Sequence, residues 1–414
     1  MAELQYFGTI EIDGSTSQAM LCMDSDASDT GLLTWFSANT RFLGARVTIQ
    51  RALQNWTLTV KMPNVFEHRD GQLRTANLTE EDRLLAGRLS ATLVPQPNGF
   101  FEGYWIDPDE NIHHKITLYP AARARVKAQV CESWEEFKSW ASRIHDAHAV
   151  AYRGQADNKW SLQTSLYRAG RSNLLRYRSD TLNEFHNHLE ALTGLHVDRH
   201  NPSEFGRMIA IAQHQGLPTP LLDWTQSPYI AAWFALSDSL NLPPPLPPNA
   251  PGYVRVYALT TAFRDAFAWD PAPPLDALHP FAAFVNFSAR DNPRLYAQQG
   301  RFVMTNIGDL ESYLLQMQSV PNGFVQGKTL LVAADIPRSV APQALKDLAL
   351  MGVTAATMFP GLEGACRMLK QQMLIQERLA PPVLPTIPGA GIPSLSTHGY
   401  TPGSYHHSGH SSLA

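Results

Sequence analysis

Alternation of apolar and polar residues between Phe7 and about Tyr119 constrains the fold more than any other feature of the chain. Successive side chains of a β-strand point to opposite faces, so short alternating runs separated by Asp-Gly and Pro-Asn-Gly turns predict antiparallel strands. Several strands at this spacing are typical of a barrel or a sandwich. The clearest runs are residues 8–14, 46–50, 56–60, 88–94 and 99–106. We therefore predict a β-rich domain over residues 1–125, which senses a trigger or binds a ligand or partner.

Three tryptophans of this region allow two interpretations: Trp35, Trp56 and Trp105. Their large rings fit the wall of a ligand pocket inside a barrel. They also fit a packed core, which is the more common place for aromatic residues on strands. We favour the core.

A change to helical periodicity near Ser133 marks a second domain. Ser133 and Glu136 stand at capping-box spacing, and large apolar residues then recur on one helical face. Strand-like and helical segments follow each other up to about residue 380. The fold class that we predict is therefore α+β, with the β-rich domain followed by an α+β domain over residues 126–380.

Two segments are expected to lie outside these cores. Segment 241–251 is dense in proline, which removes backbone donors and fixes φ, so we predict a stiff surface insertion before the strand at 252–259. A proline-rich ligand for a partner is the alternative. Residues 381–414 are rich in Pro, Gly, Ser and His and predict a disordered tail.

Composition narrows the function classes. The formal net charge is −4, and no run of Lys or Arg forms the basic stripe of a nucleic-acid-binding face. The three cysteines lie far apart, as expected of reduced thiols. The chain shows neither a signal peptide nor an apolar run long enough to span a membrane, so we expect a cytoplasmic protein with no membrane partner.

The first candidate site residue is Arg153. It ends the apolar run 149–152 and stands directly before Gly154, which permits a tight turn or the close approach of a ligand. A guanidinium binds two oxygens of a phosphate or carboxylate together. The alternative is a buried ion pair with an acid such as Asp223.

Polar side chains also concentrate at both ends of segment 213–229, beside apolar residues. Such density is typical of a binding site, because each buried polar group needs a partner. The residues are Gln213, His214, Asp223, Thr225 and Ser227. Two of them also have plain structural interpretations, since Ser227 can cap the following helix and Asp223 can anchor a turn. His214 fits a general acid or base or a hydrogen-bonded structural residue, and it has no partner at metal-ligand spacing, so no metal is expected.

Two later segments resemble the edge of a site. Gln298 and Gln299 precede a glycine and another strand. Glu363 lies between two glycines at the start of the last predicted helix, where an acid also serves as an N-terminal cap.

Five motifs, in this order along the chain, resemble those of FRG-domain proteins, which are named for a Phe/Tyr-Arg-Gly signature. They are Tyr-Arg-Gly-Gln at 152–155, Gln-His-Gln-Gly at 213–216, Thr-Pro-Leu-Leu-Asp-Trp-Thr-Gln-Ser-Pro at 219–228, Gln-Gly-Arg-Phe at 299–302 and Phe-Pro-Gly-Leu-Glu-Gly at 359–364. Several motifs in order are far more specific than any one alone. The resemblance covers roughly residues 133–377, and neither the β-rich domain nor the tail belongs to it.

The layout of that family is remotely similar to the ADP-ribosyltransferase fold, in which an arginine and a Ser/Thr-bearing strand hold NAD within a split mixed sheet. The resemblance implies NAD as a substrate, with Arg153 on a phosphate or ribose, Thr225 and Ser227 supporting the nicotinamide side, and Tyr229 stacking on a ring. It implies catalytic roles for Arg153, His214, Asp223 and Glu363. The nucleotide-binding residues that it implies are Tyr152, Gly154, Gln155, Gln213, Thr225, Ser227, Tyr229 and Gln299.

One departure leaves the reaction open. Transferases of this type need a glutamate that stabilises the cationic sugar as nicotinamide leaves, whereas the matching position here carries Gln298 and Gln299, and the nearest acids are Glu311 and Glu363. Three functions therefore compete. The first is an ADP-ribosyltransferase or NAD glycohydrolase with a macromolecular acceptor, acting as a toxin-like effector in bacterial antiphage defence and triggered by a protein at the β-rich domain. The second is a non-catalytic nucleotide-binding or nucleic-acid-binding module that this domain regulates, and the third is a scaffold in which the motifs stabilise the fold.

Overall fold

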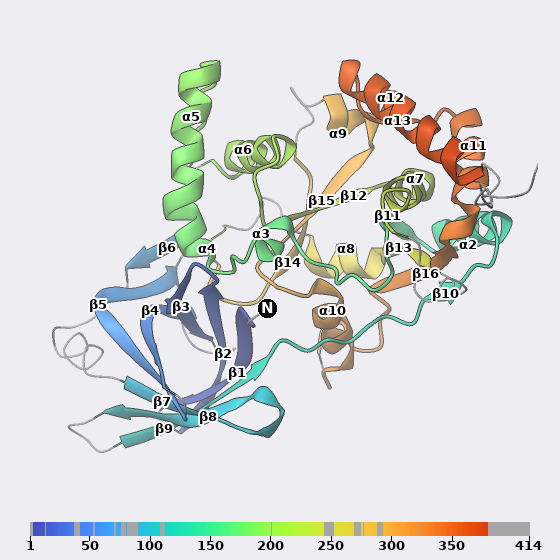
Figure 1. The fold of residues 1–414 in the computed structure, drawn as a ribbon. Helices are drawn as coiled ribbons and strands as arrows, with labels where there is room; N and C mark the ends of the chain where they lie inside the picture. The colour runs from blue at the N-terminus through green and yellow to red at the C-terminus, as the bar shows by residue number, and fades with distance from the viewer. Residues whose placement is uncertain are drawn as a thin grey trace, which may run out of the picture.

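A β-barrel and a helix-covered mixed sheet lie side by side in the computed structural model (Figure 1). The residues that the structure describes are 3–12, 14–36, 42–52, 54–69, 72–75, 80, 90–107, 112–199, 201–243, 252–268, 275, 277–287, 293–321 and 323–379. This architecture confirms the predicted α+β fold class.

The N-terminal sheet closes on itself. Its strands follow the order β4-β3-β2-β1-β9-β8-β7-β5, and an additional antiparallel pairing of β4 with β5 completes the ring, while β6 extends the sheet from β5. The strands are β1 (Gln5–Ile12), β2 (Ser15–Asp24), β3 (Ala27–Phe36), β4 (Phe42–Arg51), β5 (Trp56–Arg69), β6 (Gln72–Thr75), β7 (Ser90–Pro95), β8 (Phe101–Asp107) and β9 (Ile112–Pro120). Of the two predicted forms, the structure is the barrel and not the sandwich.

Side chains fill the interior of the barrel. Leu21, Leu33 and Leu58 come from different strands and are fully buried in one cluster. Trp105 belongs to this cluster, and Trp35 and Trp56 pack partly buried against it. The tryptophans therefore form part of a packed core, as expected for a barrel of this size.

The second sheet has the order β10-β16-β13-β11-β12-β15-β14. β10 pairs with β16 in parallel, and the other pairings are antiparallel, so the sheet is mixed. Its strands are β10 (Gln129–Val130), β11 (Ala149–Gln155), β12 (Leu221–Thr225), β13 (Tyr253–Thr260), β14 (Ala282–Val285), β15 (Gly300–Thr305) and β16 (Leu331–Pro337).

Helices follow and separate these strands. They are α2 (Trp134–Asp146), α3 (Ser165–Arg168), α4 (Leu174–Tyr177), α5 (Asn183–Thr193), α6 (Pro202–His214), α7 (Pro228–Ser239), α8 (Thr261–Phe267), α9 (Pro293–Ala297), α10 (Leu310–Ser319), α11 (Ala341–Leu350), α12 (Ala355–Met358) and α13 (Leu362–Leu379). Two short 3-10 helices are η1 (Pro97–Gly99) and η3 (Arg338–Val340), and η2 (Arg178–Leu182) is a π-helical segment between α4 and α5. The predicted helix near Ser133 is α2. Ser133 caps its N-terminus, because the Glu136 N–H donates to Ser133 Oγ over 3.2 Å.

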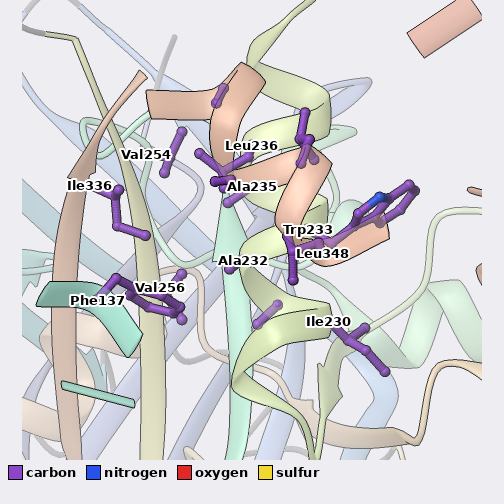
Figure 2. Packing of buried hydrophobic residues seen from close by; sticks show 14 of the residues in the cluster. Phe137, Ile230, Ala232, Trp233, Ala235, Leu236, Val254, Val256, Ile336 and Leu348 are labelled. Atoms are coloured by element: carbon purple, nitrogen blue, oxygen red, sulfur yellow. The ribbon is translucent and has the colours of Figure 1, made fainter. Parts of the chain in front are cut away.

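Apolar layers cover both faces of the mixed sheet. On one face, α7 packs against β11 and β13, and Figure 2 shows Leu236 of the helix near Val254 of β13. On the other face, Tyr257 of β13 packs with Phe263 of α8 and other apolar side chains. Because neighbouring strand residues face opposite sides, such a sheet requires nearly continuous apolar strands.

The barrel is attached to the second domain through buried polar contacts. The fully buried Gln5 donates from Nε2 to the Asn306 carbonyl over 2.7 Å and accepts from the Gly308 N–H over 2.8 Å. Asp24 accepts hydrogen bonds from Ser172 N–H and from Arg176. Apolar residues surround these contacts: Met20, Cys22, Leu32, Leu175 and Leu278.

The β-rich part ends with β9 at Pro120, and the second sheet begins with β10 at Gln129. The predicted tail, 381–414, and segment 241–251 beyond residue 243 lie outside the described residues. Within the described part of the chain, no helix combines the length and the apolar character needed to cross a membrane.

Candidate functional site

The mixed sheet splits at its centre, between β11 and β12. These strands pair at one position, Tyr152 opposite Thr225, although β11 pairs with β13 over its length and β12 does the same with β15. A pocket of about 340 Å³ opens at this split. The sheet lines it with Tyr152, Arg153, Gly154, Asp223, Trp224, Thr225, Gly300, Arg301 and Phe302. Helices and loops add Ala210, Gln213, His214, Ala231, Phe234, Asp238, Arg294, Leu295, Gln298 and Phe359.

Arg153 bridges the split. Its Nη1 donates to the main-chain carbonyl of Asp223 over 2.6 Å, where a backbone ladder between the strands is missing. The predicted alternative, an ion pair with the Asp223 carboxylate, is therefore wrong in its acceptor, because the strand geometry presents the carbonyl. Burial lowers the pKa of the guanidinium, and the nearby charge of Asp223 opposes this shift.

Three residues that line the pocket each carry a buried polar atom without a partner in the part of the chain that the structure describes. Arg153 Nε, the Tyr152 hydroxyl and Trp224 Nε1 are buried and have no hydrogen-bond partner among the described residues. Burial raises the pKa of Tyr152 to about 12, so its hydroxyl stays protonated. Unpaired buried polar groups are uncommon and costly in native proteins. Tyr152 packs in the apolar cluster on the α7 face of the sheet and Trp224 in the cluster on the opposite face, so it is Arg153 Nε that supports a ligand site at the pocket.

Gly154 permits α7 to lie directly on β11. A Cβ atom at this position would lie 1.9 Å from the carbonyl oxygen of Ala231 in that helix. The glycine of the Tyr-Arg-Gly motif is thus required for helix packing, and it holds the helix against the strand that carries Arg153.

Gln213 orients Asp223. The Gln213 Nε2 donates to Asp223 Oδ1 over 2.5 Å, and its Oε1 accepts from the hydroxyl of Thr219. Thr219 is fully buried, whereas Asp223 is exposed at the pocket. The amide therefore connects the core to the acid, which remains accessible to a ligand.

His214 follows Gln213 at the end of α6 and also lines the pocket. Burial lowers the pKa of its imidazole, and the positive charge of Arg294 lowers it further. A neutral imidazole at pH 7 is able to accept a proton.

Asp238 is a pocket residue that the sequence analysis missed. On α7, Ala231, Phe234 and Asp238 lie three and four positions apart, on one helical face, and all three line the pocket. The carboxylate is exposed at the mouth of the pocket, yet the surrounding protein desolvates it and raises its pKa, which the charges of Arg367 and Arg153 oppose. Among the described residues, no hydrogen bond or ion pair engages this carboxylate. The signal in the sequence was that Asp238 is the only charged residue of α7, whose remaining residues are mostly apolar.

Three predicted residues near the pocket do not line it. Gln155 donates from Nε2 to the Ser161 carbonyl over 3.2 Å, and Ser161 does not line the pocket either. Ser227 caps α7 by accepting from Ile230 N–H over 3.3 Å, as in its structural interpretation. Tyr229 lies edge-on to Trp134 of α2, with ring centroids 6.3 Å apart.

Of the two glutamines before β15, Gln298 lines the pocket and Gln299 does not. Gln298 donates from Nε2 to the Met358 carbonyl over 3.1 Å. Gln299 adopts a left-handed backbone conformation with φ of 48°, and its carbonyl accepts from Gln226 N–H over 3.1 Å. Gln299 therefore contacts the loop after β12 through its main chain, just after the end of α9.

Glu363 also lies outside the lining. It is ion-paired with Arg294, which lines the pocket, and with Arg367 over 2.9 Å. The guanidinium carbons of these two arginines lie 5.2 Å and 4.1 Å from the ring centroid of Phe359. Glu363 therefore acts on the pocket through Arg294. The other acid considered, Glu311, is fully buried and paired with Arg125 over 2.7 Å, away from the pocket.

No group of three or more His, Cys, Asp or Glu side chains within the described ranges is arranged to hold a metal ion. The chemistry that the pocket offers comes from its guanidinium groups, its two aspartates and the neutral His214.

Residues 148–242 match the family model of the FRG domain, so the chain contains an FRG domain in this segment. The match spans β11 to α7 and includes Arg153, Gln213, Asp223 and Asp238. It is narrower than the predicted extent of 133–377, and β15 and α13, which complete the surroundings of the pocket, follow it in the chain. No curated protein and no solved structure matches the chain.

Proposed function

We propose that the FRG domain binds a nucleotide of the NAD or ADP-ribose class at the split of its sheet, and cleaves the bond between nicotinamide and ribose. The observation that carries this proposal is that one pocket contains both a guanidinium with unused donors and a carboxylate that has no hydrogen-bond or ion-pair partner among the described residues. These groups are Arg153 and Asp238. A ligand with both phosphate and sugar hydroxyl groups would satisfy them together.

The phosphate would lie at the arginines. Arg153 has a buried Nε without a partner, and Arg301 donates from Nη1 to the carbonyl of Gly300 and keeps its other donors. Neither forms an ion pair with an acid among the described residues. Arg294 contributes less free charge, because Glu363 neutralises it. Two guanidinium groups without carboxylates are well suited to a pyrophosphate.

The sugar would lie toward the acids. Asp223 already accepts from Gln213, so Asp238 is the better acceptor for a ribose hydroxyl. As the C1′–N bond breaks, its electron pair leaves with neutral nicotinamide, and positive charge develops on the ribose. A nearby carboxylate stabilises that charge. Water or a nucleophile on an acceptor then attacks C1′ and passes its proton to a base, for which the neutral His214 is the candidate.

The biological role proposed with this chemistry is a toxin-like effector in bacterial antiphage defence, in which the barrel receives a trigger and a macromolecule accepts ADP-ribose. This part rests on the two-domain architecture and the contacts between the domains.

A non-catalytic nucleotide-binding module is the second candidate, and two observations favour it. Glu363, the glutamate considered for catalysis that lies near the pocket, is engaged by two arginines. The pocket volume of about 340 Å³ is near the lower end for ligand sites and suits one half of a dinucleotide.

Two measurements on the full chain separate these functions. Isothermal titration with ADP-ribose and NAD tests binding, and chromatography of nicotinamide released from NAD tests cleavage, with candidate acceptors added in parallel. Binding with release supports the enzyme, and binding without release under all these conditions supports the module. Absence of binding by both ligands would overturn the proposal.

A further inference from the structure

A second cavity lies between the barrel and the FRG domain. Its volume is about 920 Å³, and none of its lining residues lines the pocket at the split of the mixed sheet, which we call the cleft. The barrel contributes residues that include Arg51 of β4, and the FRG domain contributes Tyr167 and Arg168 of α3. The linker between the domains adds Arg123. We call this cavity the interdomain groove.

The acids of the groove are engaged by the protein. Glu3 accepts from the Tyr167 hydroxyl over 3.0 Å and lies 3.4 Å from Arg123. Asp24 accepts from two backbone N–H groups and from Arg176. Asp309 accepts from Ser312 N–H at the start of α10, and burial raises its pKa.

Two arginines of the groove are not balanced in this way. Arg51 contacts Met23 Sδ over 3.4 Å, and its guanidinium lies 4.7 Å from the ring centroid of Trp56. Arg168 donates to the Gln163 carbonyl over 2.5 Å. Neither lies within ion-pair distance of a carboxylate in the part of the chain that the structure describes. The groove lining has as many acids as arginines, but the guanidinium groups of Arg51 and Arg168 keep donors that none of these acids engages.

We propose that the interdomain groove binds a small phosphorylated metabolite, whose phosphate groups contact Arg51 from the barrel and Arg168 from the FRG domain. The volume is that of a small-molecule site. Arginine side chains recognise phosphate through several N–H donors at once. A ligand held by both domains would make the barrel part of a regulatory site.

A continuous path of hydrogen bonds leads from the groove to the cleft. Ser165, in the same helix as Arg168, accepts from Thr219 N–H over 3.0 Å, and Leu166 N–H donates to the Thr219 carbonyl over 3.1 Å. The Thr219 hydroxyl donates to Gln213, which in turn donates to Asp223. A shift of α3 on binding would thus reach a residue of the cleft within three contacts.

The charge of Arg168 also acts on the cleft, because it lowers the pKa of Arg153 and is itself influenced by Asp223. A phosphate bound at Arg168 would weaken the positive potential around Arg153. Binding in the groove is therefore expected to lower the affinity of the cleft for an anionic nucleotide. This link rests on the proposed function, whereas the groove as a binding site does not.

Titration with inorganic pyrophosphate tests the groove. The chain with Arg153→Ala is used, so that the main anion contact of the cleft is absent. We expect binding, and we expect Arg51→Ala in this background to weaken it roughly tenfold or more, since a charge-assisted contact is lost. Arg46→Ala removes the same charge from the same strand outside the groove and should leave the affinity unchanged. No binding, or equal affinities of the Arg51 and Arg46 variants, would overturn the proposed site.

The link is tested on the unmodified cleft. Saturating pyrophosphate should raise the dissociation constant of ADP-ribose about fivefold, at the lower end of typical coupling between sites. Arg51→Ala should abolish this effect, whereas direct competition in the cleft would persist in that variant. The link between groove and cleft is refuted if the effect of pyrophosphate persists in the Arg51→Ala variant. It is also refuted if pyrophosphate does not change the affinity of a cleft that binds ADP-ribose. A cleft that binds no ADP-ribose refutes the proposed function and leaves the titration of the groove decisive on its own.

Discussion

Arg153 donates to the main-chain carbonyl of Asp223 over 2.6 Å and so connects two strands at the position where their backbone pairing has ended. One arginine thereby stabilises the split of the sheet and presents its remaining donors, including the unpartnered Nε, to the pocket. The structural contact and the proposed ligand-binding role are thus combined in the same side chain. Variants that keep the charge and change the geometry separate the two roles.

Arg153→Lys tests the need for the planar guanidinium. Lysine keeps the positive charge but cannot contact the carbonyl and a phosphate with a fixed fork of donors. We expect ADP-ribose affinity to fall about tenfold, as measured by isothermal titration. Arg264→Lys, at an exposed site on α8, serves as the control. An unchanged affinity in the Arg153 variant would argue against its role in ligand binding.

Gly154→Ala tests the contact between β11 and α7. The added methyl group would lie 1.9 Å from the Ala231 carbonyl, so the helix must move away from the strand. Overpacking of this kind costs about 1–3 kcal/mol of unfolding free energy. Urea denaturation followed by circular dichroism measures the loss, and a variant as stable as the parent would show that the helix adapts without cost.

Asp238→Asn separates stability from function. Desolvation raises the pKa of Asp238, so the folded state favours the protonated acid. The resulting stability is present below the usual pKa of an aspartate and is lost as the pH rises through the raised value. At neutral pH the variant should therefore be at least as stable as the parent. The part of the pH dependence of unfolding free energy that comes from Asp238 should be absent. Nicotinamide release should be lost.

Chemical denaturation across the acidic range and chromatography of nicotinamide check these two outcomes. Asp265→Asn, at an exposed position on α8, is the matched control. Full release by the Asp238 variant would eliminate this residue as the acid that stabilises the sugar.

Arg294→Gln is expected to raise the pKa of His214. Burial is the larger cause of the lowered pKa and remains in the variant, but the repulsion between Arg294 and a protonated imidazole is removed. Since the folded pKa is depressed, the stability linked to neutral His214 is present at higher pH and is lost as the pH falls through that value. NMR titration of the His214 ring measures the shift, with His214→Gln used to assign the signal. A pKa that stays constant or falls would contradict the electrostatic explanation.

Gln5→Leu tests the docking of the barrel. The variant leaves the buried Asn306 carbonyl and Gly308 N–H without their partner, and each unsatisfied group costs about 1–3 kcal/mol. We expect a lower unfolding midpoint, measured by differential scanning calorimetry. Gln18→Leu, at an exposed site on β2, should leave the midpoint nearly unchanged. Equal midpoints for the two variants would show that the barrel docks mainly through its apolar contacts.

The site was only partly predictable from sequence. Motif residues such as Arg153, Gln213 and Asp223 stand next to strand ends, where their types and neighbours already indicate a site. Asp238 gave one weak local signal, a single charge in an apolar helix, and its position in the pocket depends on the packing of α7 at Gly154. Glu363 is the opposite case, because its motif suggested a catalytic acid and the structure pairs it with Arg294 and Arg367.

The sequence alone determined the alternation of the β-rich domain, the start of α2 at Ser133 and the order of the FRG motifs, because these depend on residues close together in the chain. Tertiary structure decided that β4 pairs with β5 to close a barrel and that β11 separates from β12. It also decided that Gln5 binds residues about three hundred positions away. Such contacts join segments whose spacing carries no periodic signal, and only the packing of complete domains brings them together.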